Sequence, residues 1–364
     1  METQARTRRV IWNASQWSLR RLGHVRIRLI LVTVAATAAL GVGAGFAFAR
    51  SSTPTIGTGV VVVNTKLSYQ GGAAAGTGIV LTSSGEVLTN NHVIQGETSV
   101  QVVVPGTTHT YSGKVVGYDV SADVAVIQLS GASNLKTASL GDSSKVTAGQ
   151  AVKARGNAGG TGTLTSATGT VTALGKSITV SDDQGGTEQL VGMIETNAAL
   201  QPGDSGGPLL NTSGKVIGMD TAASTSFGFR SAAASDSYAI PINTATTIAK
   251  QIESGKATAV VHIGSTAFMG VQVAGTLGGN SGFGASTSEG ALIAGTVAGG
   301  PAASAGLTAG DVITAINGQS VSSPSTITSL ILTKKPGANI TVTYTDQVGT
   351  SHVTTVTLGT GPPQ

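Results

Sequence analysis

The chain has 364 residues, which is enough for two domains with additional segments. Glycine is abundant at 52 residues and aromatic residues make up only 4% of the chain. This composition fits short strands joined by glycine-rich turns and disfavours long helices. Because the chain has no cysteine, disulfides, thiolate metal sites and thiol catalysis are excluded.

The net charge of +4 comes from the N-terminal segment. Residues 1–28 contain seven arginines and one acidic residue. The rest of the chain therefore has 14 basic and 16 acidic residues. Because that part is slightly acidic, a basic nucleic-acid-binding surface is disfavoured, and we expect no nucleic acid partner.

A predicted transmembrane segment follows the arginines. Residues 29–49 carry no charge over 21 positions, enough to cross about 30 Å of hydrocarbon as a helix. The preceding arginines favour a cytoplasmic N-terminus, residues 1–28, and place the body outside the cytoplasmic membrane. Residues 50–57 then form a polar linker. The sequence predicts a single-pass cell-membrane protein with its folded domains extracytoplasmic.

A cleaved signal peptide is the competing interpretation of the same segment. Ala47-Phe48-Ala49 resembles a signal-peptidase site, which leaves cleavage after Ala49 open. The basic region and the apolar stretch are both long for a cleaved signal, which favours an uncleaved signal anchor. A buried core helix is a third interpretation, and the dense flanking arginines argue against it.

Residues 58–243 show a pattern of short strands. Glycine or Asn/Asp separates nearly every apolar run, and about twelve runs in this length suit two six-stranded β-barrels. The predicted strands are Gly59–Val63, Gly78–Leu81, Glu86–Thr89, Ser99–Val104, Lys114–Tyr118, Val124–Leu129, Gln150–Ala154, Gly169–Leu174, Leu190–Glu195, Leu209–Leu210, Val216–Asp220 and Ser237–Pro241. Between them, Gly156–Gly162 is expected to be a surface loop.

Three residues in this region form a candidate catalytic set. His92 lies where an apolar strand enters a polar turn, Asp123 lies at the start of a buried strand, and Ser205 lies in Gly203–Pro208. A serine hydroxyl is a poor nucleophile until an imidazole takes its proton, and the imidazole needs a carboxylate to fix its tautomer. The order His, Asp, Ser is that of chymotrypsin-like double barrels. The sequence therefore predicts a serine protease.

The nucleophile motif also predicts an oxyanion hole. Its glycines let the backbone turn so that the amides of Gly203 and Ser205 point at one spot, with Asp204 between them. The alternative for the motif taken alone is an ordinary tight turn, which Gly, Asp, Ser and Pro all favour. The three motifs in the correct order make that alternative improbable.

Residues 244–266 are predicted to form a helix and a connector. Ile242, Ala245, Ile248, Ala249 and Ile252 fall on one helical stripe, and Gly255 is placed to end the helix. Residues 267–360 then contain a second strand-rich pattern with one further helix. Ser323 is a good N-cap for that helix and Pro324 a good first residue.

Several motifs resemble the HtrA (DegP/DegS-like) serine proteases. They are Thr77–Leu81, Gly85–Ile94, Tyr238–Ile242, Phe268–Val271, Gly300–Leu307 and Gly310–Gly318. The resemblance implies a mainly β fold, with a chymotrypsin-like protease domain at 58–243 and a PDZ domain at 267–360. It implies a membrane-anchored endopeptidase that acts on unfolded or damaged proteins in protein quality control and the stress response. It implies no metal and no organic cofactor.

The resemblance also suggests site residues beyond the catalytic set. Pocket-lining residues of the family fall at Ala199 and Leu200. With Thr221, Ala222 and Ala223 they would make a small uncharged pocket for aliphatic side chains. Asp204 departs from the family, which usually has Asn there, and how its charge is compensated is left open.

The PDZ-like segment implies a second binding site. Amides in the turn of Phe268, Met269, Gly270 and Val271 would capture a C-terminal carboxylate while the following strand pairs with the peptide. Ile327 and Leu330 would contact the terminal side chain, although Met269 and Ile331 fit plain packing as well. HtrA relatives are commonly trimers, so a homotrimer is implied. The rival function is a peptide-binding or chaperone module without proteolysis.

Overall fold

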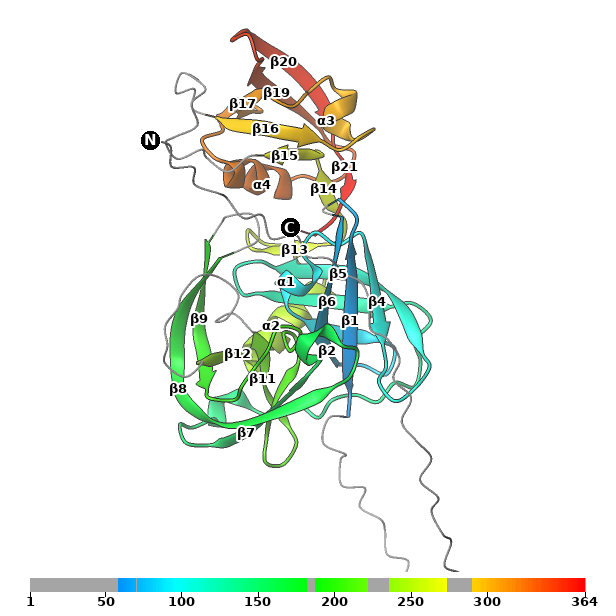
Figure 1. Ribbon diagram of the computed structural model, residues 1–364, viewed down its shortest axis with the longest axis vertical. Coiled ribbons are helices and arrows are strands. Elements are labelled where there is room, and N and C mark those ends of the chain that lie inside the picture. Colours follow the sequence, from blue (N-terminus) through cyan, green and yellow to red (C-terminus); the bar gives the residue numbers. More distant parts are fainter. Residues whose placement is uncertain (1–57, 70, 182–186, 222–235, 274–289, 364) are drawn as a thin grey trace, which may run out of the picture. The chain divides into compact units, whose positions relative to one another are not determined.

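The computed structural model describes residues 58–69, 71–181, 187–221, 236–273 and 290–363. Strands dominate these ranges, which confirms the predicted mainly β fold (Figure 1). Within them, no helix is both long enough and apolar enough to cross a membrane. The predicted anchor at residues 29–49 lies outside the described residues.

The first six strands form a sheet that closes on itself. They are β1 (Val60–Leu67), β2 (Gly72–Val80), β3 (Glu86–Thr89), β4 (Ser99–Val103), β5 (Thr110–Asp119) and β6 (Val124–Leu129). Their order is β5-β4-β1-β2-β3-β6, and an additional antiparallel pairing of β5 with β6 closes the ring. Buried valine, isoleucine and leucine side chains fill this barrel.

The next six strands form a closed barrel in the order β10-β11-β12-β9-β8-β7. They are β7 (Ala151–Gly156), β8 (Thr165–Ser181), β9 (Thr187–Thr196), β10 (Pro208–Asn211), β11 (Val216–Thr221) and β12 (Ser237–Pro241). Each of the twelve predicted apolar runs overlaps one strand of the two barrels. Short helical turns, α1 (Asn91–Ile94), η1 (Ser143–Lys145) and η2 (Ala158–Gly160), lie between strands.

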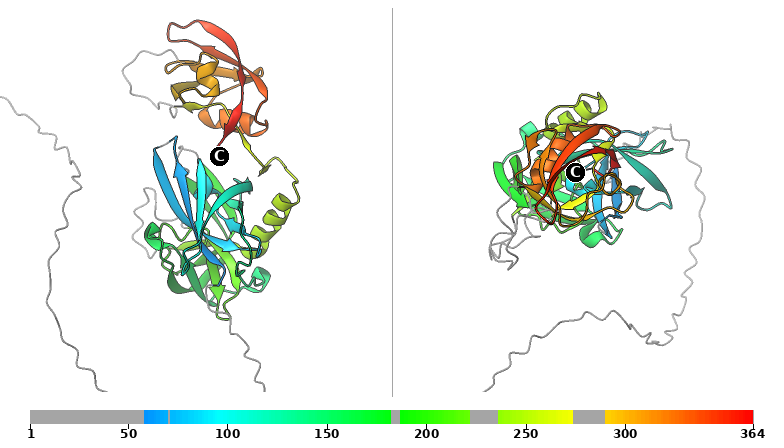
Figure 2. Two further views of the ribbon diagram at one scale, coloured as in Figure 1. Left: turned by 90° about the vertical axis from the view of Figure 1, so that its right-hand side faces the viewer. Right: turned by 90° about the horizontal axis from the view of Figure 1, so that it is seen from above.

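Helix α2 (Ile242–Glu253) follows the second barrel and lies along the outside of the strands (Figure 2). Its apolar stripe of Ile242, Ala245, Ala249 and Ile252 joins a core that draws residues from both barrels. Gly255, with φ of +69°, follows the end of the helix as predicted. The predicted connector after it contains an unexpected strand, β13 (Val261–Ile263), which pairs with β5.

The C-terminal region has its own sheet and its own core. Strands β15 (Val271–Val273), β16 (Ala291–Thr296), β17 (Val312–Ile316), β19 (Asn339–Thr345) and β20 (Ser351–Thr357) lie in that order, with β18 (Gln319–Ser320) beside β17. A separate pair joins β14 (Thr266–Phe268) to β21 (Gly359–Gly361). Helices α3 (Pro301–Ser304) and α4 (Pro324–Leu332) complete it. The side chain of Ser323 accepts a hydrogen bond from the Thr326 amide, as predicted for the N-cap.

Candidate active site

His92 and Asp123 meet in the first barrel. His92 lies in the short α1 turn after β3, and Asp123 lies just before β6. The ring Nδ1 of His92 is 2.9 Å from Oδ2 and 3.1 Å from Oδ1 of Asp123. The backbone amide of His92 also donates to Oδ1 at 3.0 Å. A carboxylate in this position holds the Nδ1–H tautomer and leaves Nε2 to act as a base.

The carboxylate of Asp123 is fixed by contacts on several sides. Asp123 is buried and adopts a φ of +54°, a left-handed conformation that non-glycine residues seldom take. Asn90 Nδ2 donates to its carbonyl at 2.9 Å, and Thr221 Oγ1, from the second barrel, donates to Oδ2 at 3.2 Å. The acid is therefore held in one orientation by groups from both barrels.

Ser205 lies in a turn between β9 and β10 that only glycine can complete. A Cβ on Gly206 would come within 2.1 Å of the Thr77 carbonyl oxygen, and its φ is +82°. The Thr77 amide donates to the Ser205 carbonyl at 2.8 Å. The Gly206 amide donates to the Asp220 carbonyl, next to Thr221, which binds Asp123. Two successive residues of β11 thus connect the nucleophile turn to the acid.

The peptide between Pro202 and Gly203 is oriented by its neighbours. The Pro202 carbonyl accepts a hydrogen bond from the Gly159 amide at 2.7 Å, in the η2 turn. Because the peptide is trans, the Gly203 N–H points away from η2. Thr77 Oγ1 donates to the Gly203 carbonyl at 2.7 Å and accepts from the Asn157 amide at 2.9 Å. The assignment of the Gly203 amide as an oxyanion donor stays a prediction.

Asp204 turns inward from the same segment. Its side chain is buried, its Oδ2 accepts from the Gln201 amide at 2.9 Å, and burial raises its pKa. The carboxyl of Asp220 is fully buried, and burial followed by the nearby negative charge of Asp204 places its pKa well above the ordinary value. The turn therefore contains one buried acid, Asp204, and hydrogen-bonds to the backbone of a second, Asp220.

The residues predicted to line a substrate pocket separate in the structure. Ala199 is exposed, whereas Leu200 is buried in the core of the second barrel. Thr221 is buried and its hydroxyl is committed to Asp123. Ala222 and Ala223 lie outside the described residues. The pocket assignment stays a prediction.

The predicted peptide site of the C-terminal region lies at a sheet edge. Strand β15 is the terminal strand of its sheet and pairs with β16 on one side. The turn before it has Gly270 at φ of +78°, while Met269 and Ile327 are buried in the local core and Leu330 packs against that core. The Phe268 ring stacks on the Tyr69 ring, with the two ring centroids 5.1 Å apart. An edge strand can accept an extended peptide, and whether this one does is still a prediction.

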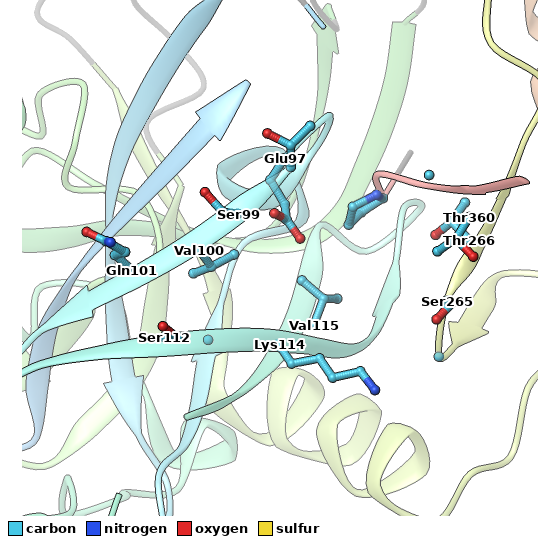
Figure 3. Close-up of a pocket in the computed structure, with 15 residues that line it drawn as sticks. Glu97, Ser99, Val100, Gln101, Ser112, Lys114, Val115, Ser265, Thr266 and Thr360 are labelled. Carbon is cyan, nitrogen blue, oxygen red and sulfur yellow. The ribbon is translucent and has the colours of Figure 1, made fainter. Parts of the chain in front are cut away.

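A hollow of about 360 Å³ lies apart from the catalytic set. Its lining includes Glu97, Lys114, Thr266 and Thr360 (Figure 3). Burial raises the pKa of Glu97. None of the catalytic residues lines this hollow. Across the described ranges, no group of three or more His, Asp or Glu side chains could hold a metal ion.

Three residues with clear contacts at this site were not expected from the sequence. Thr77 and Asn90 sit in ordinary strand or turn positions, and Asp220 ends an apolar run. Thr77 and Gly203 are 126 residues apart in the chain, so their contact has no local signal. Asn90 lies inside the His92 motif, Gly85–Ile94, so of the three residues it is the one that sequence reasoning could most easily have linked to the site.

Two family models match the chain in the regions just described. The model for the trypsin-like peptidase domain matches residues 76–219, and the model for the PDZ domain matches residues 258–345. The first match includes His92, Asp123 and Ser205. The second contains the edge strand β15 and helix α4.

The curated relatives of this chain are named as serine proteases. Serine protease PepD of Mycobacterium tuberculosis is 36% identical over 314 residues, covering 82% of this chain and 63% of the relative. A probable periplasmic serine protease do/HhoA-like of Haemophilus influenzae is 37% identical, covering 79% and 58%. Periplasmic pH-dependent serine endoprotease DegQ of Escherichia coli is 32% identical, covering 73% and 55%. The chain therefore spans less than two thirds of these relatives.

Among solved structures, the HtrA-type protease AlgW with tripeptide matches 85% of this chain and 95% of its own, at 28% identity and a TM-score of 0.47.

Proposed function

Because this chain belongs to the HtrA-type serine proteases, with a trypsin-like peptidase domain and one PDZ domain, we propose that it is a serine endopeptidase. His92 acts as general base and then general acid, Asp123 orients it, and Ser205 attacks the peptide carbonyl. The amides of Gly203 and Ser205 stabilise the tetrahedral oxyanion. The observation that carries the proposal is the 2.9 Å contact between His92 and Asp123, tied to the nucleophile turn through β11.

The substrates that we propose are unfolded or damaged proteins outside the cytoplasmic membrane. Support comes from relatives named as periplasmic proteases and from the arginine-rich segment followed by residues 29–49. In this arrangement the chain remains anchored by residues 29–49. A protein in cells that begins at Arg50 and is free in the medium would contradict the proposal that residues 29–49 remain as an anchor.

We further propose that the PDZ domain binds free C-terminal peptides. Support comes from the open edge of β15 and the Met269–Gly270 turn before it. Fluorescence anisotropy with the Ser205→Ala chain compares a labelled peptide ending in valine with the same peptide amidated. The free carboxylate should bind more tightly, and equal affinity would exclude carboxylate capture. A homotrimer, implied by the family resemblance, is tested by a size measurement on the same protein.

The assay for the main proposal is cleavage of unfolded casein. The wild-type chain should cleave casein, and Ser205→Ala should not, because it removes one hydroxyl and leaves the surrounding backbone contacts in place. The alternative, a proteolytically silent binding module, predicts no cleavage by either protein.

A further inference from the structure

Asn90 lies directly before α1, at the position where an asparagine usually caps a helix. A capping side chain accepts a hydrogen bond from one of the first helical amides. The side chain of Asn90 makes no such capping bond. Its Nδ2 instead donates to the backbone carbonyl of Asp123, 33 residues away in the chain, at 2.9 Å. Helix capping therefore does not account for Asn90, and its side chain is directed to the carboxylate partner of His92.

The burial of Asn90 also argues against a purely structural role. None of its surface is exposed, and across the described ranges its Oδ1 has no hydrogen-bond partner. A buried polar atom without a partner destabilises the folded state. Positions that break such a rule of folding are commonly functional. The amide is therefore better explained by what Nδ2 does for Asp123 than by the stability of the turn.

The carbonyl that Asn90 binds belongs to a residue with an unusual backbone. Asp123 has a φ of +54°, a left-handed conformation that a non-glycine residue keeps only where its surroundings hold it. Its amide donates to the Val120 carbonyl at 3.2 Å, and Val124 after it pairs with Asp119 in the sheet. Asn90 supplies the contact on the carbonyl side. Because the backbone sets the direction of the Cα–Cβ bond, a change at this carbonyl would move the carboxylate.

Asn90 and His92 hold Asp123 from both ends. Nδ2 of Asn90 binds the backbone carbonyl, while the His92 amide donates to Oδ1 at 3.0 Å and the His92 ring Nδ1 lies 2.9 Å from Oδ2. Two residues separated by a single position therefore bind the main chain and the side chain of the same aspartate. Thr221 binds only Oδ2, so its hydroxyl does not fix the backbone of Asp123.

We propose that Asn90 is a positioning residue, which holds the left-handed backbone of Asp123 through the hydrogen bond to its carbonyl and so keeps the carboxylate against Nδ1 of His92. The inference rests on the proposed peptidase function. Asn90 acts through Asp123 rather than on the substrate. A displaced carboxylate stabilises the imidazolium of the transition state less well, so the loss should appear in kcat while KM changes little.

Matched substitutions test this role. Asn90→Ala removes the donor, and we expect kcat to fall by about tenfold or more while KM stays within about threefold of wild type. Asn90→Ser is the second variant, used if Asn90→Ala folds poorly, because its hydroxyl ends one bond closer to the backbone and cannot make the same contact. Asn243→Ala is the control. It removes an exposed amide of the same domain, whose Nδ2 donates to Asp142 at 2.8 Å, and should match wild type.

A double-mutant cycle separates positioning from packing. In Asp123→Ala there is no carboxylate for Asn90 to position, and triad variants retain a residual activity that can be measured. Adding Asn90→Ala to that chain should lower the residual kcat by less than about twofold. A packing role would instead give the same fall of kcat in both backgrounds, because the side chain that is lost is the same.

The hydrogen bond between His92 and Asp123 provides a readout that needs no cleavage. An Nδ1 proton held by a carboxylate is strongly deshielded, so its proton NMR resonance lies far downfield and is identified by its absence in His92→Ala. In the full chain, we expect this resonance in wild type and in Asn243→Ala. In Asn90→Ala it should move upfield or be lost through exchange with water. Urea unfolding of the same proteins shows whether each variant is folded.

Two results would overturn the proposal. One is an Asn90→Ala chain with the kcat and the downfield resonance of wild type, which would show that Asp123 keeps its position without the amide. The other is an equal fall of kcat in the two backgrounds of the cycle. If the wild-type chain cleaves no casein, the peptidase proposal fails, while the resonance still decides whether Asn90 holds Asp123 against His92.

Discussion

Thr77 offers a direct test of how the nucleophile turn is held. Its hydroxyl donates to the Gly203 carbonyl at 2.7 Å and accepts from the Asn157 amide at 2.9 Å, and the residue is fully buried. Thr77→Val keeps the shape and leaves both backbone groups without this partner. An orphaned buried polar group costs about 1–3 kcal/mol, so two cost about 2–6 kcal/mol before relaxation.

Even the lower limit of this cost, about 2 kcal/mol, should have a measurable effect on catalysis. A loss of about 2 kcal/mol in the active arrangement corresponds to roughly a 30-fold fall in kcat/KM. The free energy of unfolding, measured in urea, should fall by a similar amount. Thr77→Ser is the matched control, because it retains the hydroxyl and should stay within about threefold of wild type. Wild-type kcat/KM and stability in Thr77→Val would show that the hydroxyl does not hold the turn.

The other predictions concern Asp204, Glu86 and the hydrogen bond from Thr221 to Asp123. Asp204→Asn should preserve or raise kcat/KM, because the oxyanion forms next to one fewer carboxylate; a loss of several orders of magnitude would show that the carboxylate supports the turn. Thr221→Val should lower kcat by about tenfold by removing the 3.2 Å hydrogen bond to Asp123, and an unchanged kcat would count against that support. Burial and the hydrogen bond to Glu253 raise the pKa of Glu86 to about 7. Stability should therefore be lost as pH rises through about 7 in wild type but not in Glu86→Gln, as measured by urea unfolding at pH 5.5 and 8.5; equal pH dependence in the two proteins would refute the shift.

The strands could be predicted from the sequence because each contains a short apolar run bounded by turn residues. The run Val124–Leu129, for example, is apolar at nearly every position and forms β6 with five of its six residues buried. β8 is different, since the sequence predicted Gly169–Leu174 and the strand extends over Thr165–Ser181. Its additional length comes from backbone pairing with β7 and β9, which side-chain polarity does not report.

The catalytic residues could be found because each lies in a short motif, whereas their supports depend on contacts distant in sequence. Gly156–Gly162 was expected to be a plain surface loop, yet the amide of Gly159 orients the Pro202 carbonyl. Thr221 was expected only as a pocket residue, and nothing in its sequence context indicates that its hydroxyl also binds Asp123. An aspartate such as Asp220 at the end of an apolar run usually marks an exit to solvent, and only the packing of β11 against the turn shows that it is buried.

The central claim is that His92 and Asp123 activate Ser205. A fluorophosphonate reacts with activated serine hydroxyls, so mass mapping of the labelled protein tests the claim directly. We predict one adduct, on Ser205, that is lost in His92→Ala, while the control Asp346→Asn labels as wild type does. Failure of Ser205 to label, or equal labelling in His92→Ala, would contradict the account.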